Sequence, residues 1–378
     1  MAHPDGEVAP QLKHVVMKAS SDRTVEAGRV ADAAGEVPVR VLAAGDRLVG
    51  IAEEREETMA LRATVAVCTY NGAERLPRVL AALERQTFLT ESWEVVVVDN
   101  ASTDETVSVV EGWLGRSDCR MSGRVVTEGN QGLSFARERA AREARGEVVC
   151  FVDDDNVPSP DWLELAVGAF ARRVNAGVIG GKVEACWEAA PTPLAEAVAG
   201  FALAIVDLGP HPVLVDGTGS GIVGAGMCVR RGLLLRIFDE FRFRERISDR
   251  RGNDLISGGD LAVSVAARML GMECWYEPGM RMEHVLPPSR MAKPYLLRLF
   301  SGIGRGQAAL RRLHDWRARS PLAWLIGLKD LMRWVAGDLR GPDDGKGGET
   351  ADLARDLHEL RQAQTLGRAT QALRWPLN

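Results

Sequence analysis

Strand-like and helix-like hydrophobic patterns alternate along the chain from residue 63 onward. Strand-like segments occur at 63–70, 93–100, 123–129, 148–152 and 176–186, and the one at 93–100 has a continuous apolar run of the kind found in strands buried on both faces. Apolar residues recur at helical spacing between these runs, at 73–86, 101–115, 133–146 and 159–173. This alternation predicts an α/β fold, in which a doubly wound, mostly parallel sheet is flanked by helices.

Several polar residues and glycines indicate where the predicted helices begin or end. Ser102 and Glu105 have capping-box spacing at the start of the second helix. Ser159 suits the N-cap of the fourth helix, and Pro160 suits its first turn. Gly146 suits the end of the third helix, because glycine commonly follows the last helical turn.

The same patterns divide the chain into a central domain and less regular ends. Residues 61–290 carry the alternating strands and helices. Residues 1–60 are weakly patterned, and we expect a small hairpin around Ala44-Gly45-Asp46 after a loop-like segment. After the central domain, the sequence predicts a helical extension at 291–340 and a linker at 341–350. Residues 351–378 predict a C-terminal amphipathic helix suited to self-association.

Composition indicates a globular protein without nucleic-acid affinity. The 378 residues are 46% hydrophobic and carry a formal net charge of −5 with a pI near 5.8, which gives no basic footprint for nucleic acid. The N-terminus lacks a signal-peptide pattern, and no stretch of about 18 uncharged apolar residues predicts a membrane span. The six cysteines are scattered without a C-x-x-C pair, which favours reduced thiols in a cytoplasmic protein over a zinc site.

Polar residues follow three of the predicted strands. They are Thr69-Tyr70-Asn71, Asp99-Asn100 and Asp153-Asp154-Asp155. Ligands of doubly wound sheets bind beyond the carboxyl ends of the strands. Because these three segments come from separate strands but should share one edge, they predict a ligand site there.

The three aspartates at 153–155 end an apolar run and therefore need compensation for their charge. In an extended chain, Asp153 and Asp155 face one side, while Asp154 faces away or into a turn. A divalent cation, Mg²⁺ or Mn²⁺, suits such oxygen ligands. The alternative is a loop without a metal, because Asp, Asn, Pro and Ser in "DDDNVPSP" are all turn residues.

Four stretches of the chain have a characteristic order and spacing: "VAVCTYNGAERLPRVLAALERQT", "EVVVVDNASTDET", "GNQGLSFARERAAREARGEVVCFVDDDNVPSPDWL" and "SGGDLAVSVAARMLGMECWYEPGMRMEH". Through these stretches, the chain resembles the family 2 glycosyltransferases over roughly residues 63–285. This resemblance implies a GT-A fold, a nucleotide-sugar donor, here expected to be a UDP-sugar, a divalent metal and inversion at the anomeric carbon. Residues 61–185 would form the nucleotide-sugar half and 186–290 the acceptor half.

The resemblance also implies which residues contact the donor. The loop after the first strand would hold the nucleoside, Asp99 would hydrogen-bond the base, and Asp153 would face the ribose. The full donor-binding set is Thr69, Tyr70, Asn71, Asp99, Gly132, Arg137, Asp153 and Asp154. Each position also has a purely structural interpretation: Asp99 could cap a helix, and Arg137 lies in an arginine-rich run of the kind usually found on a solvated face.

The resemblance further implies a metal held by Asp155 and His284 and a general base at Asp260. His284 could instead be a surface histidine, and Asp260 could be a helix N-cap. The acidic residue that usually precedes the base in this family is replaced here by Gly259. That departure leaves open a nucleotide-sugar-binding protein that has lost catalysis.

Two further alternatives concern the enzyme class and the acceptor. A haloacid dehalogenase-type phosphatase also has D-x-D after an apolar run, but several strand-helix units precede the aspartates here. A saccharide, a lipid-linked, a peptide or a small-molecule acceptor all remain open, and a homo-oligomer is compatible with the sequence.

The segment at 291–340 bears on where the protein acts. It predicts either a helical cap on the domain or a platform at a membrane surface, because it is rich in Arg and Trp. These residues include Arg298, Arg305, Arg311, Arg312, Trp316, Trp324 and Trp334. The sequence therefore predicts a cytoplasmic protein, with peripheral contact at the inner face of the membrane as an extension of that prediction.

Overall fold

The computed structural model describes residues 28–32, 35–44, 47–52, 61–217, 220–241, 243, 249–252, 254–314, 332 and 349–373. The chain separates into two compact units, Met1–Thr58 and Met59–Asn378.

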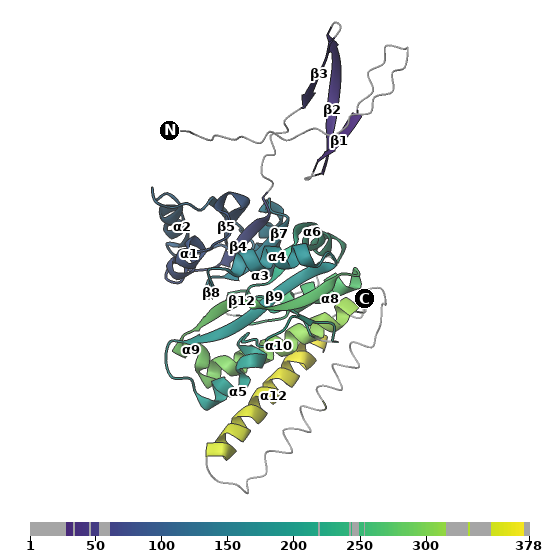
Figure 1. The fold of residues 1–378 in the computed structure, drawn as a ribbon. Coiled ribbons are helices and arrows are strands. Elements are labelled where there is room, and N and C mark those ends of the chain that lie inside the picture. Colours follow the sequence, from purple (N-terminus) through teal and green to yellow (C-terminus); the bar gives the residue numbers. More distant parts are fainter. Residues whose placement is uncertain are drawn as a thin grey trace, which may run out of the picture. The chain divides into compact units, whose positions relative to one another are not determined.

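The first unit contains a three-stranded antiparallel sheet of β1 (Gly28–Asp32), β2 (Gly35–Ala44) and β3 (Arg47–Ala52), drawn in purple in Figure 1. β2 and β3 form a hairpin in which Ala44 lies opposite Arg47. β1 corrects the expectation of a loop before this hairpin, because its backbone pairs with β2 along its whole length.

The described part of the second unit contains one nine-stranded sheet in the order β10-β12-β9-β11-β7-β4-β5-β6, with β8 pairing with β12. Its strands are β4 (Ala63–Thr69), β5 (Trp93–Asp99), β6 (Gly123–Thr127), β7 (Val148–Asp153), β8 (Asn156–Pro158), β9 (Ala176–Trp187), β10 (Val213–Leu214), β11 (Cys228–Arg230) and β12 (Glu273–Leu286). β8, β10 and β11 run against the direction that the other six described strands share. The predicted mostly parallel sheet is therefore confirmed.

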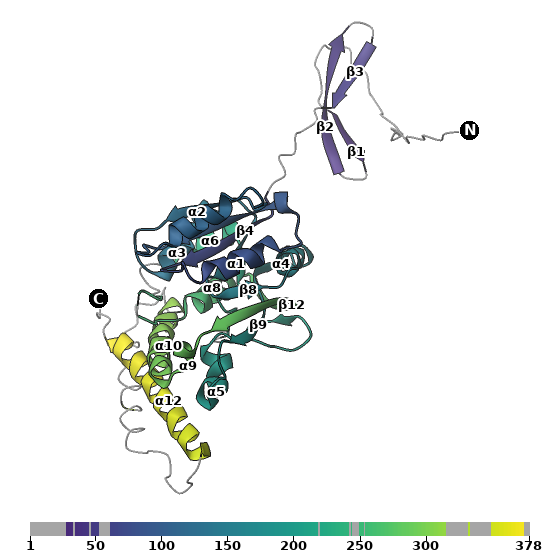
Figure 2. The same cartoon turned by 90° about the vertical axis from the view of Figure 1, so that its left-hand side faces the viewer.

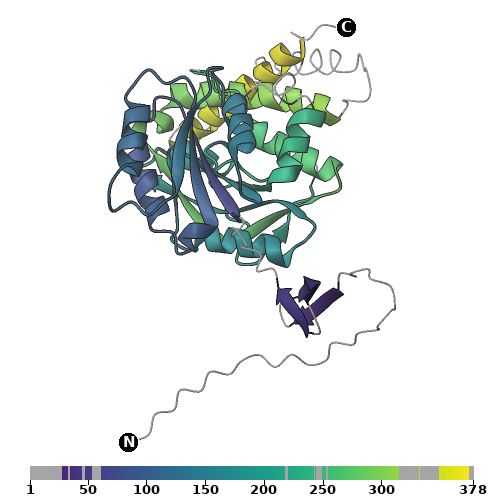
Figure 3. The same cartoon turned by 90° about the horizontal axis from the view of Figure 1, so that it is seen from above.

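Helices cover both faces of this sheet, as Figure 3 shows from above. They are α1 (Leu76–Glu84), α2 (Thr106–Leu114), α3 (Leu133–Glu143), α4 (Trp162–Arg172), α5 (Pro193–Ala202), α6 (Arg231–Glu240), α8 (Gly259–Met269), α9 (Pro288–Met291), α10 (Lys293–His314) and α12 (Glu349–Leu373), with a short 3₁₀ turn, η1 (Thr90–Ser92). Alternate residues of β4 face opposite cores. Val65 and Val67 pack with α1 and α4, whereas Ala66 and Cys68 pack with α3, α6 and α8.

The predicted capping box at the second helix is wrong. α2 begins at Thr106, and Glu105 at its N-cap makes no side-chain capping bond. The Ser102 hydroxyl oxygen instead accepts the backbone N–H of Asn71 at 2.9 Å. Ser102 therefore joins two loops at the sheet edge rather than starting a helix.

Two other predicted helix boundaries are also displaced. The N-cap of α4 is Asp161, and the Ser159 hydroxyl donates to its carboxylate at 2.8 Å. α3 ends at Glu143, before Gly146. Gly146 serves the turn into β7, where an added Cβ would lie 2.3 Å from the carbonyl carbon of Ala63.

Two helices after the sheet, α10 and α12, pack side by side (Figures 1 and 2). A Cβ on Gly304 of α10 would lie 1.9 Å from the carbonyl oxygen of Gln364, and one on Gly367 of α12 would lie 2.1 Å from that of Ser301. The helix backbones therefore touch without intervening side chains at these points. Beyond His314, the predicted extension and linker lie outside the described residues, apart from Met332 and the start of α12.

None of the helices in the described part of the chain combines the length and apolar character needed to cross a membrane.

Candidate active site

The polar strand ends lie on neighbouring strands. Thr69 pairs with Asp99 in the β4–β5 register, and Cys68 pairs with Asp153 in the β4–β7 register. The Thr69 hydroxyl donates to Oδ2 of Asp154 at 2.6 Å. The three polar segments therefore form one continuous surface at the carboxyl edge of the parallel strands.

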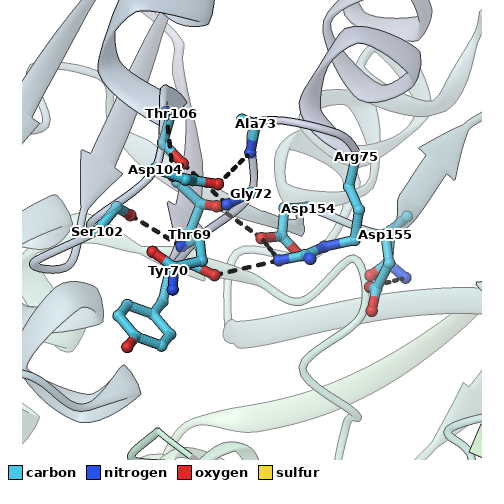
Figure 4. Close-up of polar contacts among 12 residues, drawn as sticks. Thr69, Tyr70, Gly72, Ala73, Arg75, Ser102, Asp104, Thr106, Asp154 and Asp155 are labelled. Carbon is cyan, nitrogen blue, oxygen red and sulfur yellow. Dashed lines mark hydrogen bonds and ion pairs between the residues drawn. The ribbon is translucent and has the colours of Figure 1, made fainter.

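The loop after β4 is held by the loop after β5. Asn71 has a left-handed backbone with φ of 49°, and its Oδ1 accepts the backbone N–H of Thr103 at 2.8 Å. Tyr70 is 36% exposed, and Figure 4 shows its ring pointing away from the Asp154 network. The loop is thus fixed by its backbone and by Asn71, while the Tyr70 ring remains open to a ligand.

Gly72 makes room for the hydrogen bond between Thr69 and Asp154. A Cβ at this position would lie 2.0 Å from Oγ1 of Thr69 and 2.9 Å from Oδ2 of Asp154. The Gly72 N–H donates to the Thr106 hydroxyl at 2.9 Å, which ties the start of α1 to the start of α2. Any larger residue at position 72 would displace the Thr69 hydroxyl.

Asp99 and Asn100 organise the next loops along the edge. Asp99 is buried, and its Oδ1 accepts the backbone N–H of Ser102 at 3.2 Å. Because α2 starts later, Asp99 closes a turn rather than capping a helix. Asn100 accepts the N–H of Gly132 at 2.7 Å, and Gly132, with φ of 145°, is the N-cap of α3.

Each of the three aspartates at the end of β7 and in the turn after it faces an arginine from a different part of the chain. The contacts join Asp153 to Arg137 at 3.9 Å, Asp154 to Arg75 at 2.7 Å and Asp155 to Arg290 at 2.6 Å. Arg75 precedes α1, Arg137 lies on α3 and Arg290 lies on α9. Arginine side chains thus supply the countercharge that the aspartate triplet requires.

The backbone from Asp153 to Asp155 is not extended, as the i, i+2 argument assumed. β7 ends at Asp153 and β8 begins at Asn156, so the chain turns between them. Asp154 points into the turn, where Thr69 and Arg75 bind it (Figure 4). Its carboxylate is therefore occupied by the protein itself.

Asp155 lies beside His284 in the interior. His284 is buried on β12, which excludes the surface-histidine alternative. Its Nδ1 lies 2.8 Å from the carbonyl oxygen of Leu203, so Nδ1 carries the hydrogen. Its Nε2 accepts a bond from Arg290 at 3.0 Å and lies 3.6 Å from Oδ2 of Asp155.

The charges around Asp155 control its ionisation. Burial raises the pKa of this carboxyl, but the positive charge of Arg290 and the contact with His284 outweigh burial and hold the pKa well below its ordinary value. Asp155 is therefore an ionised carboxylate over the whole neutral range.

Asp155 and His284 offer two ligands of the types that Mn²⁺ takes, a carboxylate oxygen and an imidazole lone pair. No group of three His, Cys, Asp or Glu side chains among the described residues could hold a metal by itself. Arg290 also contacts both candidate ligands. Asp155 and His284 therefore fit a divalent cation if Arg290 moves aside and a bound substrate supplies further oxygen ligands.

Arg137 differs from the other arginines of α3. Arg139 and Arg142 make half-exposed ion pairs with glutamates of the same helix, whereas Arg137 is buried. Its Nη1 lies 3.4 Å from Oδ2 of Asp249. A Cβ on Gly224 would lie 2.4 Å from Nη2, so the absence of a side chain there makes room for the guanidinium.

The carboxyls on either side of Arg137 are both protonated more readily than usual. Burial raises the pKa of Asp153, with Arg137 opposing the shift and Asp155 adding to it. Burial likewise raises the pKa of Asp249, and Arg137 again opposes the shift. One guanidinium thus serves two carboxylates, of which Asp249 is buried and Asp153 is partly exposed.

Asp260 lies in the first turn of α8. Its Oδ1 accepts the N–H of Leu261 and its Oδ2 accepts the N–H of Gly224, both at 2.8 Å. The N-cap itself is Gly258, which has φ of 135°. The carboxylate is therefore fixed by two backbone donors, although it does not cap the helix.

Several site residues were not predicted from the sequence. Arg75 and Arg290 lie inside or next to the motifs, but no periodicity indicates that they pair with aspartates. Asp249 lies in a strongly charged segment, and Gly224 lies in a glycine-rich stretch of the half that was expected to bind the acceptor. No sequence pattern marks the arginines that lie opposite the aspartate triplet.

Residues 64–236 match the sequence model of a family described as glycosyl transferase family 2. The poly(ribitol-phosphate) beta-N-acetylglucosaminyltransferase TarS of Staphylococcus aureus is 34% identical over 106 residues, which cover 28% of this chain and 18% of the relative. The glucosyl-dolichyl phosphate glucuronosyltransferase of Haloferax volcanii is 28% identical over 131 residues, which cover 34% of this chain and 40% of the relative. The matched stretch thus spans less than half of either relative.

Among solved structures, the mannosyltransferase PcManGT from Pyrobaculum calidifontis in complex with GDP-Man and Mn²⁺ aligns with a TM-score of 0.48 and 21% identity, covering 82% of this chain and 73% of that one. Asp260 and His284 lie beyond the residues that the family model matches. The family-model match gives no support to the alternative of a haloacid dehalogenase-type phosphatase. The chain therefore carries a family 2 glycosyltransferase domain, and the matched residues 64–236 include the first three of the four stretches that carry the resemblance.

Proposed function

We propose that the protein transfers a sugar from a nucleotide-sugar donor, a UDP-sugar, to an acceptor nucleophile with inversion at the anomeric carbon. The observation that carries this proposal is the position of the Asp260 carboxylate. Two backbone N–H groups fix it, and its charge acts on the buried Arg137, as does the charge of the strand-end residue Asp153. A general base and a donor-binding edge that both lie near one guanidinium suit a single displacement.

The donor would lie along the carboxyl ends of β4, β5 and β7. Asp99, buried at the end of β5, is suited to the base, and the exposed Tyr70 ring offers a stacking surface for it. Asp153 lies between Asp99, which would bind the nucleobase, and Asp155, which would bind the metal, so Asp153 is suited to the ribose. Asn71 and Gly132 would act through the loops they fix, and Thr69 and Asp154 would hold the edge together.

The reaction would run in one step. The acceptor oxygen attacks the anomeric carbon while the bond from that carbon to the diphosphate oxygen breaks, and the diphosphate leaves with the electron pair. Asp260 takes the proton that the acceptor loses. No covalent sugar intermediate is needed, and inversion follows from attack opposite the leaving group.

Asp155 and His284 would hold the divalent metal, Mn²⁺ or Mg²⁺. When bound, the metal would neutralise negative charge that grows on the departing diphosphate. Arg290 would have to release both side chains first. Once released, its guanidinium would remain close enough to contribute positive charge on the same side of the donor.

Several acceptor classes suit the proposed transfer. A saccharide, a lipid-linked sugar, a peptide or a small molecule would each present a suitable nucleophile.

The packing of α10 on α12 and the ion pair from Arg305 to Asp254 support the helical-cap interpretation of α10. The tryptophans at 316, 324 and 334 lie outside the described residues, so membrane contact and a cytoplasmic location stay predictions.

Asp260→Asn tests the proposed chemistry. Asn keeps the shape of the side chain but takes no proton, so we expect turnover to fall by at least about 10²-fold while donor affinity stays near that of the parent. Turnover would be measured as nucleoside diphosphate released from UDP-glucose, UDP-N-acetylglucosamine or GDP-mannose with Mn²⁺. Near-parental turnover by the variant would remove Asp260 as the base, and absence of turnover by the parent on every donor would favour a binding protein.

A further inference from the structure

Asp249 is a buried carboxylate next to the proposed base that the reaction scheme leaves without a role. Its side chain is 5% exposed. Oδ1 accepts the N–H of Arg250 at 2.9 Å, and Oδ2 lies 3.4 Å from Nη1 of Arg137. The carbonyl of Arg250 accepts the N–H of Leu133 at 2.9 Å, which anchors this segment to the start of α3.

The Asp249 carboxylate fills the place of a side chain at position 259. A Cβ built on Gly259 would lie 2.1 Å from Oδ2 and 2.9 Å from Cγ of Asp249. The same Cβ would lie 3.6 Å from Nη1 of Arg137. A carboxylate carried by residue 259 would therefore overlap the one that Asp249 supplies and would reach the same guanidinium.

We propose that Asp249 supplies, from the preceding loop, the carboxylate that position 259 lacks, and that it positions Arg137 beside Asp260. This inference rests on the proposed function, because it gives Asp249 a task in the same site. Asp249 is a positioning residue: it acts on the base through Arg137.

The electrostatic reason lies in what Arg137 would do without this partner. Arg137 is buried between Asp153 and Asp249, and the charge of Asp260 also acts on it. If Asp249 were removed, Asp260 would be an alternative carboxylate for the guanidinium. A base paired with a fixed positive charge accepts a proton less readily. Asp249 thus keeps Asp260 available for the acceptor.

The test is a double-mutant cycle between positions 249 and 259. Asp249→Ala should lower nucleoside diphosphate release about tenfold or more and move the acidic limb of the pH–rate profile to lower pH. Gly259→Asp alone should also lower release, because its side chain displaces the Asp249 carboxylate. Asp249→Ala combined with Gly259→Asp should recover release to within about threefold of the parent.

Asp254→Ala provides a matched control. Asp254 lies in the same segment and pairs with an arginine, Arg305, but it does not contact Gly259 or Arg137 in the contacts described. This variant should keep the parental pH profile. UDP affinity, measured by calorimetry with Mn²⁺, should stay near the parental value in all variants.

The inference is overturned if the double variant turns over no faster than the slower single variant, or if Asp249→Ala stays within about twofold of the parent. If the parent releases nucleoside diphosphate from none of the three donors, the proposed function fails separately. Melting temperatures of the four proteins then decide whether the two positions share one carboxylate. Additive losses contradict the inference, and recovery in the double variant supports it.

Discussion

Arg290 holds both side chains that are proposed to bind the metal. Its guanidinium contacts Asp155 at 2.6 Å and Nε2 of His284 at 3.0 Å, and its own side chain is 20% exposed. Such a partly buried pair is costly to break when only one partner is removed. The arginine and a divalent cation therefore compete for one carboxylate and one imidazole nitrogen.

Arg290→Gln should consequently tighten Mn²⁺ binding. Loss of the guanidinium frees both ligands and removes a repelling positive charge, so we expect the Kd for Mn²⁺ to fall about tenfold, which corresponds to about 1.4 kcal/mol. The electron paramagnetic resonance signal of free Mn²⁺ measures this directly. Asp155→Ala should abolish the binding.

Arg298→Gln is the control for that measurement, since Arg298 is an exposed arginine of α10. Its Mn²⁺ affinity should equal that of the parent. Unchanged or weaker binding by Arg290→Gln would show that the arginine does not occupy the metal position.

At the level of elements, the contact of α10 with α12 depends on glycines. Gly304 and Gly367 let each helix approach the carbonyl groups of the other. A methyl group at either position must push the helices apart, because the atoms in the way belong to the backbone and have little freedom to move.

Gly304→Ala should therefore lower the free energy of unfolding by about 1–3 kcal/mol. Gly112→Ala is its matched control: Gly112 lies in exposed helix α2 with nothing within 4 Å of an added Cβ. There, replacement should raise stability by about 0.5–1 kcal/mol. Urea unfolding of the two variants checks both signs, and equal effects would contradict the close helix contact.

The elements that could be predicted from the sequence are those whose burial leaves a mark on it. β5 reads as a strand because Val95–Val98 are buried on both faces of the sheet. The caps were less predictable, because Ser102 and Ser159 have other partners nearby, Asn71 and Asp161, which compete for their hydroxyls.

The residues of the candidate site also divide into those that leave a mark on the sequence and those that do not. Asp99, Asp153 and Asp260 could be located from motifs that end strands or begin a helix. Their electrostatic partners could not, because Arg75 is 79 residues from Asp154 and no periodic signal connects them. Asp249 was hidden for a related reason: a charged segment indicates a solvated loop, whereas its burial depends on the arginine of a distant helix.

At the level of the whole molecule, residues 59–378 carry their own core. Three clusters of buried hydrophobic residues lie within the described part of this unit, two on the faces of the sheet and one among α5, α9, α10 and α12. The first unit pairs its three strands among themselves. The second unit thus contains the apolar burial needed for independent stability.

A chain beginning at Met59 should fold and bind UDP with Mn²⁺ as the full protein does. We expect its main melting transition to lie within about 2 °C of that of the full chain, because no core residue is removed. Calorimetry and circular dichroism measure the two quantities. An insoluble product, or lost UDP binding with the melting transition intact, would show that residues 1–58 contribute to the second unit.

The pairing of the aspartate triplet with three separated arginines bears on the order in which the chain folds. Arg137 comes from the helix directly before β7, so the Asp153 contact closes a short loop at little entropic cost. Arg75 closes a longer loop to Asp154, and Arg290, on α9, closes the longest one, to Asp155. The entropic cost of loop closure therefore rises from the first aspartate to the third. We expect Asp155 to be the last of the three to gain its arginine when the domain folds.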